Sequence, residues 1–204
     1  MSTHVPSRPV GRSVSEKTLL DGPALARTLA RVAHEIIERN DELESVALVG
    51  IRTRGVPIAE RLAELIEEQS GVEVALGAVD ITFHRDDRAA SDGDSGDPAG
   101  QPIVHATDLE FPLAGATCVL VDDVLYTGRT IRAAIETLFA HGRPARVQLA
   151  VLVDRGHREL PIRPDYVGKN LPTARSERIQ VQLVERDGVD RILLVNVAEE
   201  DTRA

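Results

Sequence analysis

Apolar residues along the chain follow two periodicities, and these predict alternating helices and strands. Between residues 22 and 40 they recur every three or four positions, which predicts an amphipathic helix. Asp21 stands where a side chain caps a first turn, and Pro23 is tolerated in that turn. The same spacing predicts helices over residues 56–69 and 131–140. Short apolar and β-branched runs predict strands over residues 45–51, 72–83, 119–121, 147–153, 165–167, 178–184 and 191–197. This alternation indicates an α/β fold with a parallel sheet flanked by helices on both faces.

Two segments interrupt the pattern. Residues 1–14 have no periodic apolar positions and no secretory core, so we expect a disordered N-terminal tail. Residues 84–110 are rich in Asp and Gly and hold seven acids against two arginines, which predicts a long flexible loop. We therefore expect one domain over residues 15–200 that contains this loop.

Composition narrows the function classes. A chain of 204 residues suits a single α/β domain, and no apolar run reaches the 18 residues typical of a membrane span. The single cysteine, Cys118, excludes an internal disulfide and favours a reducing, cytoplasmic location. A net charge of −9 argues against broad charge-driven binding of nucleic acid, although it leaves room for a local basic face.

The most informative stretch is CVLVDDVLYTGRT, residues 118–130. A buried parallel strand is followed by the paired acids Asp122 and Asp123, and then by a Thr-Gly loop that opens the helix 131–140. Backbone N–H groups at such a helix start favour a phosphate. The two carboxylates repel phosphate and suit hydroxyl groups or a metal instead. The stretch therefore predicts a site for a phosphorylated sugar.

A second loop, GIRTRG at residues 50–55, also lies between a predicted strand and a predicted helix. Its glycines allow close backbone approach, and Arg52 and Arg54 are suited to oxyanions. Arg52, Asp122 and Asp154 all follow predicted strands, and parallel sheets bind ligands at the carboxyl ends of their strands. We expect these loops to form one site.

The run of apolar residues, two acids and TG-x-T resembles the phosphoribosyl-diphosphate (PRPP) motif of type I phosphoribosyltransferases. The resemblance implies that the acids bind the ribose hydroxyls, that the Thr-Gly loop holds the 5′-phosphate, and that loop 52–55, which often contains a non-proline cis peptide in this family, holds the diphosphate. Mg²⁺ is then bound through the diphosphate rather than by direct protein ligands. The implied PRPP and nucleotide-binding residues are Arg52, Thr53, Arg54, Gly55, Val121, Asp122, Asp123, Val124, Leu125, Tyr126, Thr127, Gly128, Arg129 and Thr130.

The same resemblance assigns roles to the loop and to a hood over the base. The flexible loop would close over PRPP and exclude water, with Arg85 approaching the diphosphate. Residues 155–185 would form the hood, where Arg155 meets an exocyclic oxygen of the base and the Ile179 region reads its edge. The implied catalytic residues are Asp122, Asp123, Arg54 and Arg85.

Within this family, the chain resembles bacterial pyrimidine-operon regulators that are also uracil phosphoribosyltransferases. The strings VDDVLYTGRT, VGIRTRG, VDRGHRELPIR and DYVGKN carry the match, which extends over residues 20–183. Purine-salvage members place an acid where this chain has Tyr126, which is a poor substitute for proton exchange with a purine. The implied reaction forms UMP and diphosphate from uracil and PRPP. A purine or orotate phosphoribosyltransferase without RNA binding is the alternative.

A regulator of this kind binds the pyr mRNA leader hairpin in response to UMP or UTP, and its catalysis is then weak or vestigial. Residues 143–178 hold eight cations and four acids, a local charge of +4. Together with the polar face of helix 22–40, they predict a basic patch for an RNA hairpin. Its predicted contact residues are Arg31, His34, Arg39, His157, Arg158, Arg163 and Lys169. The resemblance also implies a homodimer or a larger even homo-oligomer. It leaves open whether control acts on transcription or on translation.

Overall fold

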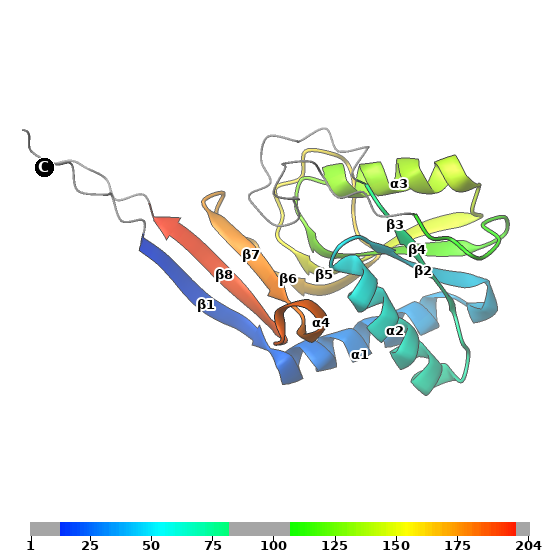
Figure 1. Ribbon diagram of the computed structural model, residues 1–204, viewed down its shortest axis with the longest axis horizontal. Coiled ribbons are helices and arrows are strands. Elements are labelled where there is room, and N and C mark those ends of the chain that lie inside the picture. The colour runs from blue at the N-terminus through cyan, green and yellow to red at the C-terminus, as the bar shows by residue number, and fades with distance from the viewer. Residues whose placement is uncertain (1–12, 82–106, 199–204) are drawn as a thin grey trace, which may run out of the picture.

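A five-stranded parallel sheet forms the centre of the computed structural model, which describes residues 13–81 and 107–198 (Figure 1). The strand order is β3-β2-β4-β5-β6. The strands are β2 (Val46–Ile51), β3 (Ala75–Val79), β4 (Thr117–Leu125), β5 (Arg146–Asp154) and β6 (Tyr166–Asn170). The predicted parallel α/β sheet is confirmed.

Helices cover both faces of this sheet (Figure 1). α1 (Gly22–Arg39) and α2 (Gly55–Ser70) pack on one face, and α3 (Arg129–His141) packs on the other. Side chains of β4 alternate between the two layers, so that Val119 joins the core under α1 and α2 while Leu120 joins the core under α3. Burial on both faces explains why the strands are continuously apolar.

A second sheet lies beside the first and is antiparallel, in the order β1-β8-β7. Its strands are β1 (Ser13–Asp21), β7 (Glu177–Gln182) and β8 (Arg191–Ala198), and the short helix α4 (Val184–Asp187) joins the last two. We call this sheet with α4 the hood. Leu20, Val181 and Ile192 pack into the core under α1. The hood is therefore built from both ends of the described chain, beyond the predicted range 155–185, whereas β6 belongs to the main sheet.

The predictions missed β1 and α4. Ser15 to Thr18 of β1 are exposed, and the strand is held by backbone pairing with β8, so its residues give little apolar signal. The predicted tail therefore ends before residue 13, and its residues 1–12 lie outside the described chain. A 3₁₀ turn, Leu43–Ser45, also precedes β2.

Several boundaries differ from the predictions, most clearly those of β3, of β4 and of the long loop. β3 covers only Ala75–Val79 of the predicted strand 72–83. β4 continues to Leu125 because its ladder with β5 extends as far as the pair Leu125 and Asp154. The predicted loop 84–110 ends earlier than expected, because Asp108 forms a backbone bridge to Ala78 of β3 with hydrogen bonds of 2.7 and 2.8 Å. Residues 82–106 lie outside the described chain. Among the described helices, none combines the length and apolarity needed to cross a membrane.

Candidate functional site

The carboxyl ends of β2, β4 and β5 lie side by side at one edge of the main sheet. β4 pairs with both neighbours, so the segments that follow Ile51, Leu125 and Asp154 meet at this edge. The loop after β2 leads into α2, and the loop after β4 leads into α3. The sequence-predicted site residues of both loops are therefore brought together, as expected for a parallel sheet.

The paired acids lie inside β4 rather than after it. The backbone N–H of Asp123 donates to Oδ1 of Asp122 over 2.9 Å, and that of Val124 donates to Oδ1 of Asp123 over 2.7 Å. These bonds orient both carboxylates at the end of the strand. Asp122 is buried and Asp123 is half-buried. Two oriented carboxylates of this kind can accept hydrogen bonds from adjacent hydroxyl groups of a ligand.

Electrostatics link the acids to the loop after β2. Burial raises the pKa of Asp123 above its ordinary value, and the Val124 amide and the charge of Arg54 act in the opposite direction. The Arg54 guanidinium and the Asp123 carboxylate are therefore electrostatically linked at this edge of the sheet.

Both helices that start at this edge lack a side-chain cap. α1, which starts elsewhere, has its first turn capped by Asp21, which accepts from the Ala24 N–H over 2.9 Å as predicted. No side chain caps α2 at Arg54 or α3 at Gly128. Gly128 has a φ of 94°, which an L side chain rarely adopts. Apart from the Arg129 N–H, which donates to Thr127 Oγ1 over 3.4 Å, the first N–H groups of α2 and α3 thus form two anion cradles, one on each side of the acids.

The loop after β2 is shaped for an anion as well. Its Arg52–Thr53 peptide bond is cis, as the family resemblance predicted. A Cβ on Gly55 would lie 2.2 Å from the carbonyl oxygen of Val121, so glycine is required for α2 to start this close to β4. The Nε atoms of Arg52 and Arg54 are buried and have no hydrogen-bond partner within the described residues. Buried donors of this kind favour an anionic ligand that completes their bonding.

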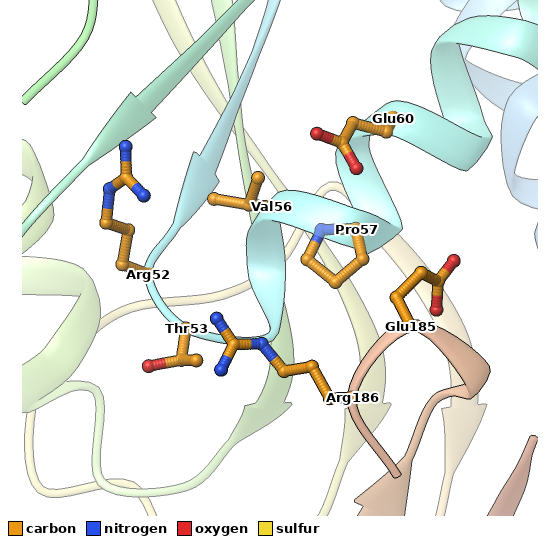
Figure 2. A pocket seen from close by; sticks show the side chains of 7 residues that line it. All are labelled: Arg52, Thr53, Val56, Pro57, Glu60, Glu185 and Arg186. Atoms are coloured by element: carbon orange, nitrogen blue, oxygen red, sulfur yellow. The ribbon is translucent and has the colours of Figure 1, made fainter. Parts of the chain in front are cut away.

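A pocket of about 480 Å³ opens beside this loop (Figure 2). One wall comes from the loop and from α2, and Arg186 extends from α4 toward the loop that carries Thr53. Asp187, also on α4, holds the Arg54 guanidinium through a 3.4 Å ion pair. The sequence predictions missed α4 as part of the site. The sequence feature that could have indicated α4 is VERDGVDR at residues 184–191, where acids and arginines alternate between two apolar strands. The lining residues are Arg52, Thr53, Val56, Pro57, Glu60, Glu185 and Arg186.

Arg155 connects Tyr126, at the start of the Thr-Gly loop (residues 126–130, called the phosphate loop below after its predicted ligand), to the hood. Its guanidinium carbon lies 4.1 Å from the centroid of the Tyr126 ring, and its Nε donates to Thr173 Oγ1 over 3.0 Å. Its Nη2 donates to the carbonyl oxygen of Glu177, the first residue of β7, over 2.8 Å. Arg155 is buried, and burial lowers the pKa of its guanidinium. Ile179, the second predicted base contact, is half-buried in β7 and packs against the core.

The predicted RNA contacts fall into two groups. On α1, Arg31 pairs with Glu35 and donates to the carbonyl oxygens of Val167 and Gly168, over 3.0 and 2.6 Å. Arg39 donates to the Asp165 carbonyl oxygen over 2.8 Å. The polar face of α1 therefore lies along β6, beside the exposed Lys169. His34 pairs with Glu38 over 3.3 Å on the same helix.

The second group lies on the loop after β5. His157 is exposed, has a φ of 60° and hydrogen-bonds the Thr173 carbonyl oxygen. Arg163 is exposed, and no hydrogen bond of its side chain is formed with other described residues. Arg158 differs from the expected free cation, because its guanidinium is taken up by Asp154 and by backbone carbonyls. Its side chain is only 21% exposed.

The remaining predictions concern the loop and the metal. Arg85 lies outside the described residues. Within the described chain, no group of three or more His, Cys, Asp or Glu side chains is arranged to hold a metal ion. Burial raises the pKa of the Cys118 thiol to about 11, so this cysteine is not activated as a nucleophile.

Comparisons with known proteins agree with this geometry. Residues 15–186 match the phosphoribosyl transferase domain family. The chain is 56% identical over 183 residues to the "Bifunctional protein PyrR" of Roseiflexus sp. (strain RS-1), covering 89% of this chain and 96% of the relative. It is 52% identical to the protein of the same name from Chloroflexus aurantiacus, covering 92% and 99%.

Solved structures show the same fold. The hypoxanthine phosphoribosyltransferase of Trypanosoma cruzi superposes with a TM-score of 0.65 at 16% identity, covering 89% of this chain and 97% of the other. A hypoxanthine-guanine phosphoribosyltransferase of Bacillus anthracis gives 0.63 at 18% identity, covering 91% and 99%. The uncapped cradles, the paired acids and these matches together identify the chain as a member of the phosphoribosyltransferase family and, within it, of the PyrR proteins.

Proposed function

We propose that this protein transfers the phosphoribosyl group of PRPP to uracil, forming UMP and diphosphate. The observation that carries the proposal is the pair of uncapped helix starts on either side of Asp122 and Asp123. PRPP is a pentose with a phosphate at one end, a diphosphate at the other and two hydroxyl groups between them. The two anionic ends of PRPP match the two helix starts, and its hydroxyl groups match the two acids between them.

Each part of the site has a defined task in the reaction. The amides from Thr127 to Thr130 hold the 5′-phosphate, and Asp122 and Asp123 accept from the ribose hydroxyls. Arg52 and Arg54 hold the diphosphate with their buried donors. Uracil N1 then forms a bond to C1′ while the bond from C1′ to diphosphate breaks, and the N1 proton leaves to solvent. Positioning and electrostatic stabilisation supply the acceleration.

Mg²⁺ fits the site as a partner of the diphosphate. The side chains of Arg52 and Arg54 are cationic and would not ligate a cation, so the ion would be bound through the diphosphate rather than by these residues. When bound, it neutralises charge on the leaving diphosphate. Asp122 and Asp123 remain available for the ribose hydroxyls.

Loss of the paired acids tests the catalytic assignment. Asp122→Asn with Asp123→Asn removes the charged acceptors, and we expect UMP formation from uracil and PRPP to fall by about a hundredfold or more. The matched control, Glu67→Gln with Glu68→Gln, replaces two consecutive acids that are exposed on α2. We expect it to leave turnover unchanged. Turnover of the site variant within about threefold of the parent would contradict the assignment.

Base choice is tested separately. Tyr126 lies under Arg155, with no carboxylate at its position to exchange a proton with a purine. We expect turnover with uracil and PRPP but not with hypoxanthine, guanine or orotate. Faster turnover of a purine or of orotate would support the alternative phosphoribosyltransferase.

We further propose that the protein is a regulator that binds the pyr mRNA leader hairpin when UMP or UTP occupies the site. The exposed cations Arg163 and Lys169 and the alignment of α1 with β6 support a basic surface for RNA. In a gel-shift assay with that hairpin, we expect UMP to strengthen binding. We expect the double variant Arg163→Gln with Lys169→Gln to bind the hairpin more weakly.

The control for RNA binding removes the same charge from another place. Arg143 and Arg146 are exposed at the opposite end of β5, and the control variant replaces both with Gln. We expect this variant to bind RNA as the parent does. Equal losses in both variants would mean that net charge alone, rather than the proposed surface, sets the affinity.

A further inference from the structure

We infer that Arg158 is a positioning residue that joins the phosphate loop to the basic segment 156–163, so that a bound nucleotide orders this segment for RNA. The inference deepens the proposed regulatory function and rests on it. Arg158 was predicted as a direct RNA contact, and the structure assigns its guanidinium to three parts of the chain instead.

The first part is the end of β4. Nη1 of Arg158 donates to the carbonyl oxygen of Tyr126 over 2.8 Å and to that of Leu125 over 3.4 Å. These two residues directly precede Thr127 and Gly128 of the phosphate loop. The guanidinium therefore fixes the backbone from which the 5′-phosphate cradle starts.

The second and third parts belong to the basic segment and to β5. Nη1 also donates to the Gly156 carbonyl oxygen over 3.2 Å, and Nε donates to that of Ile162 over 3.1 Å. Nη2 donates to the Asp154 carboxylate at the end of β5. One planar group thus holds both ends of segment 156–163 against β4. The rigid fork of arginine makes this possible, because it directs five N–H groups in one plane.

The backbone repeats the same connection. The N–H groups of Glu159 and Leu160 both donate to the Thr127 carbonyl oxygen, over 3.0 and 3.2 Å. The Arg129 guanidinium also pairs with Glu159 over 2.9 Å. A Cβ at Gly128 would lie in contact, at 3.4 Å, with Leu160 and with Ile162. The phosphate loop and the middle of the segment therefore form one packed unit.

This unit presents two exposed basic side chains, His157 and Arg163, at its two ends. A ligand that favours one arrangement of Thr127 and Gly128 favours one arrangement of the segment as well, because both share the same hydrogen bonds. Coupling of this kind requires only that the nucleotide binds the ordered state more tightly than the loose one. Arg158 supplies the connection without touching the RNA.

Arg158→Lys separates a positioning role from a direct contact. Lysine keeps the positive charge for RNA but has three donors on one atom and cannot span the carbonyls of Tyr126 and Ile162. If Arg158 positions the segment, UMP no longer strengthens RNA binding in this variant. If Arg158 contacts the RNA as a charge, the enhancement by UMP persists.

The experiment measures the affinity for the pyr leader hairpin with and without UMP in the parent, in Arg158→Lys and in Arg163→Gln. We expect the parent to gain about 5- to 150-fold from UMP, the usual range of such coupling. Arg158→Lys keeps its nucleotide-free affinity to within about threefold, loses the gain and raises the KM for PRPP. Arg163→Gln weakens binding with and without UMP by the same factor.

Hydrogen exchange gives a readout that does not involve RNA. The amides of Glu159 and Leu160 exchange more slowly when UMP is added to the parent or to Arg163→Gln, and they do not respond in Arg158→Lys. Should Arg158→Lys fail to fold by circular dichroism, Asp154→Asn takes its place, because it loosens the guanidinium and keeps its charge. The same outcomes then apply.

Failure of the inference is distinct from failure of the proposed function. If the parent responds to UMP and Arg158→Lys responds equally, the inference is wrong and the regulatory function stands. If Arg158→Lys loses affinity equally with and without UMP, Arg158 is a direct contact. If the parent itself shows no response to UMP, the regulatory proposal fails and the inference fails with it.

Discussion

The guanidinium carbon of Arg155 lies 4.1 Å above the centroid of the Tyr126 ring, and this contact joins the phosphate loop to the hood. His157 meets the same ring edge-on, with 5.9 Å between the ring centroids. A buried cation on an aromatic face contributes about 0.5–2 kcal/mol. The residue that argues against a purine substrate is therefore also a structural part of the site.

Replacement of the Tyr126 ring tests this contact. We expect Tyr126→Leu to lower the free energy of unfolding by about 1–2 kcal/mol, because the guanidinium stays buried without its aromatic partner. Tyr126→Phe keeps the ring and serves as the control, with a change of less than about 0.5 kcal/mol. Urea unfolding followed by circular dichroism measures both. Equal losses in the two variants would assign the effect to the hydroxyl group instead.

The raised pKa of Asp123 predicts an unusual pH dependence of stability. Burial disfavours the charged carboxylate in the folded state, so ionisation destabilises the fold. This destabilisation is absent at pH values below the unfolded pKa, grows as the pH rises from the unfolded to the folded pKa, and is constant above the folded pKa. We expect Asp123→Asn to be more stable than the parent at pH 7, with a difference that disappears in acid.

Thermal unfolding between pH 3 and pH 8 checks this expectation. Asp41 is exposed, and Asp41→Asn is the matched control. We expect its stability relative to the parent not to change between pH 3 and pH 8 in this way. In the proposed reaction the same ionisation governs activity, because the carboxylate is the form that would accept from the ribose hydroxyls. The kcat/KM for PRPP should therefore begin to fall at a higher pH than an ordinary aspartate would give.

If Arg54 binds the diphosphate as proposed, Asp187 competes with the diphosphate for its guanidinium. The ion pair is partly exposed and 3.4 Å long, which corresponds to about 0.2–1 kcal/mol. We expect Asp187→Asn to lower the KM for PRPP by about two- to fivefold, because the guanidinium no longer has to leave a carboxylate. The amide oxygen still accepts from the Leu183 N–H, so α4 is retained. Steady-state kinetics measure the KM for PRPP in the parent and in Asp187→Asn. An unchanged or raised KM in the variant would contradict the competition.

Arg61 holds α4 against α2 through two carboxylates. It contacts Glu185 over 2.7 Å and Asp190 over 2.8 Å, and its hydrogen bonds keep the pKa of both acids below the ordinary values. These lowered values stabilise the fold above the unfolded pKa of each acid, and the stabilisation is lost as the pH falls through the folded values.

Arg61→Met leaves the two acids facing each other without their partner. We expect a loss of about 1–2 kcal/mol in the free energy of unfolding at pH 7, since Glu185 remains partly in water. The loss shrinks in acid. Arg27→Met, on an exposed residue of α1, controls for charge and length. Chemical unfolding at pH 7 and at pH 3 measures both variants, and a loss that does not depend on pH would rule out the ion pairs as its cause.

Local sequence determined the main sheet, its three long helices and the two ligand loops. The apolar runs of β2, β4 and β5 are continuous because both faces of a parallel strand are buried. In the three long helices, apolar residues recur every three or four positions, which made these helices predictable. The Thr-Gly loop, the arginine loop and the pair Asp122 and Asp123 were recognisable as candidates because each is a motif of residues adjacent in the chain.

Only the tertiary structure decided the composition of the hood, the position of α4 beside the pocket and the hydrogen-bond partners of Arg158. β1 pairs with β8, at the other end of the described chain, through backbone bonds that leave little trace in side-chain hydropathy. Arg158 is set by carbonyl oxygens 32 residues away at Tyr126. A guanidinium seeks acceptors wherever the fold brings them, so its charge is visible in the sequence, whereas its partners are determined by contacts between distant segments.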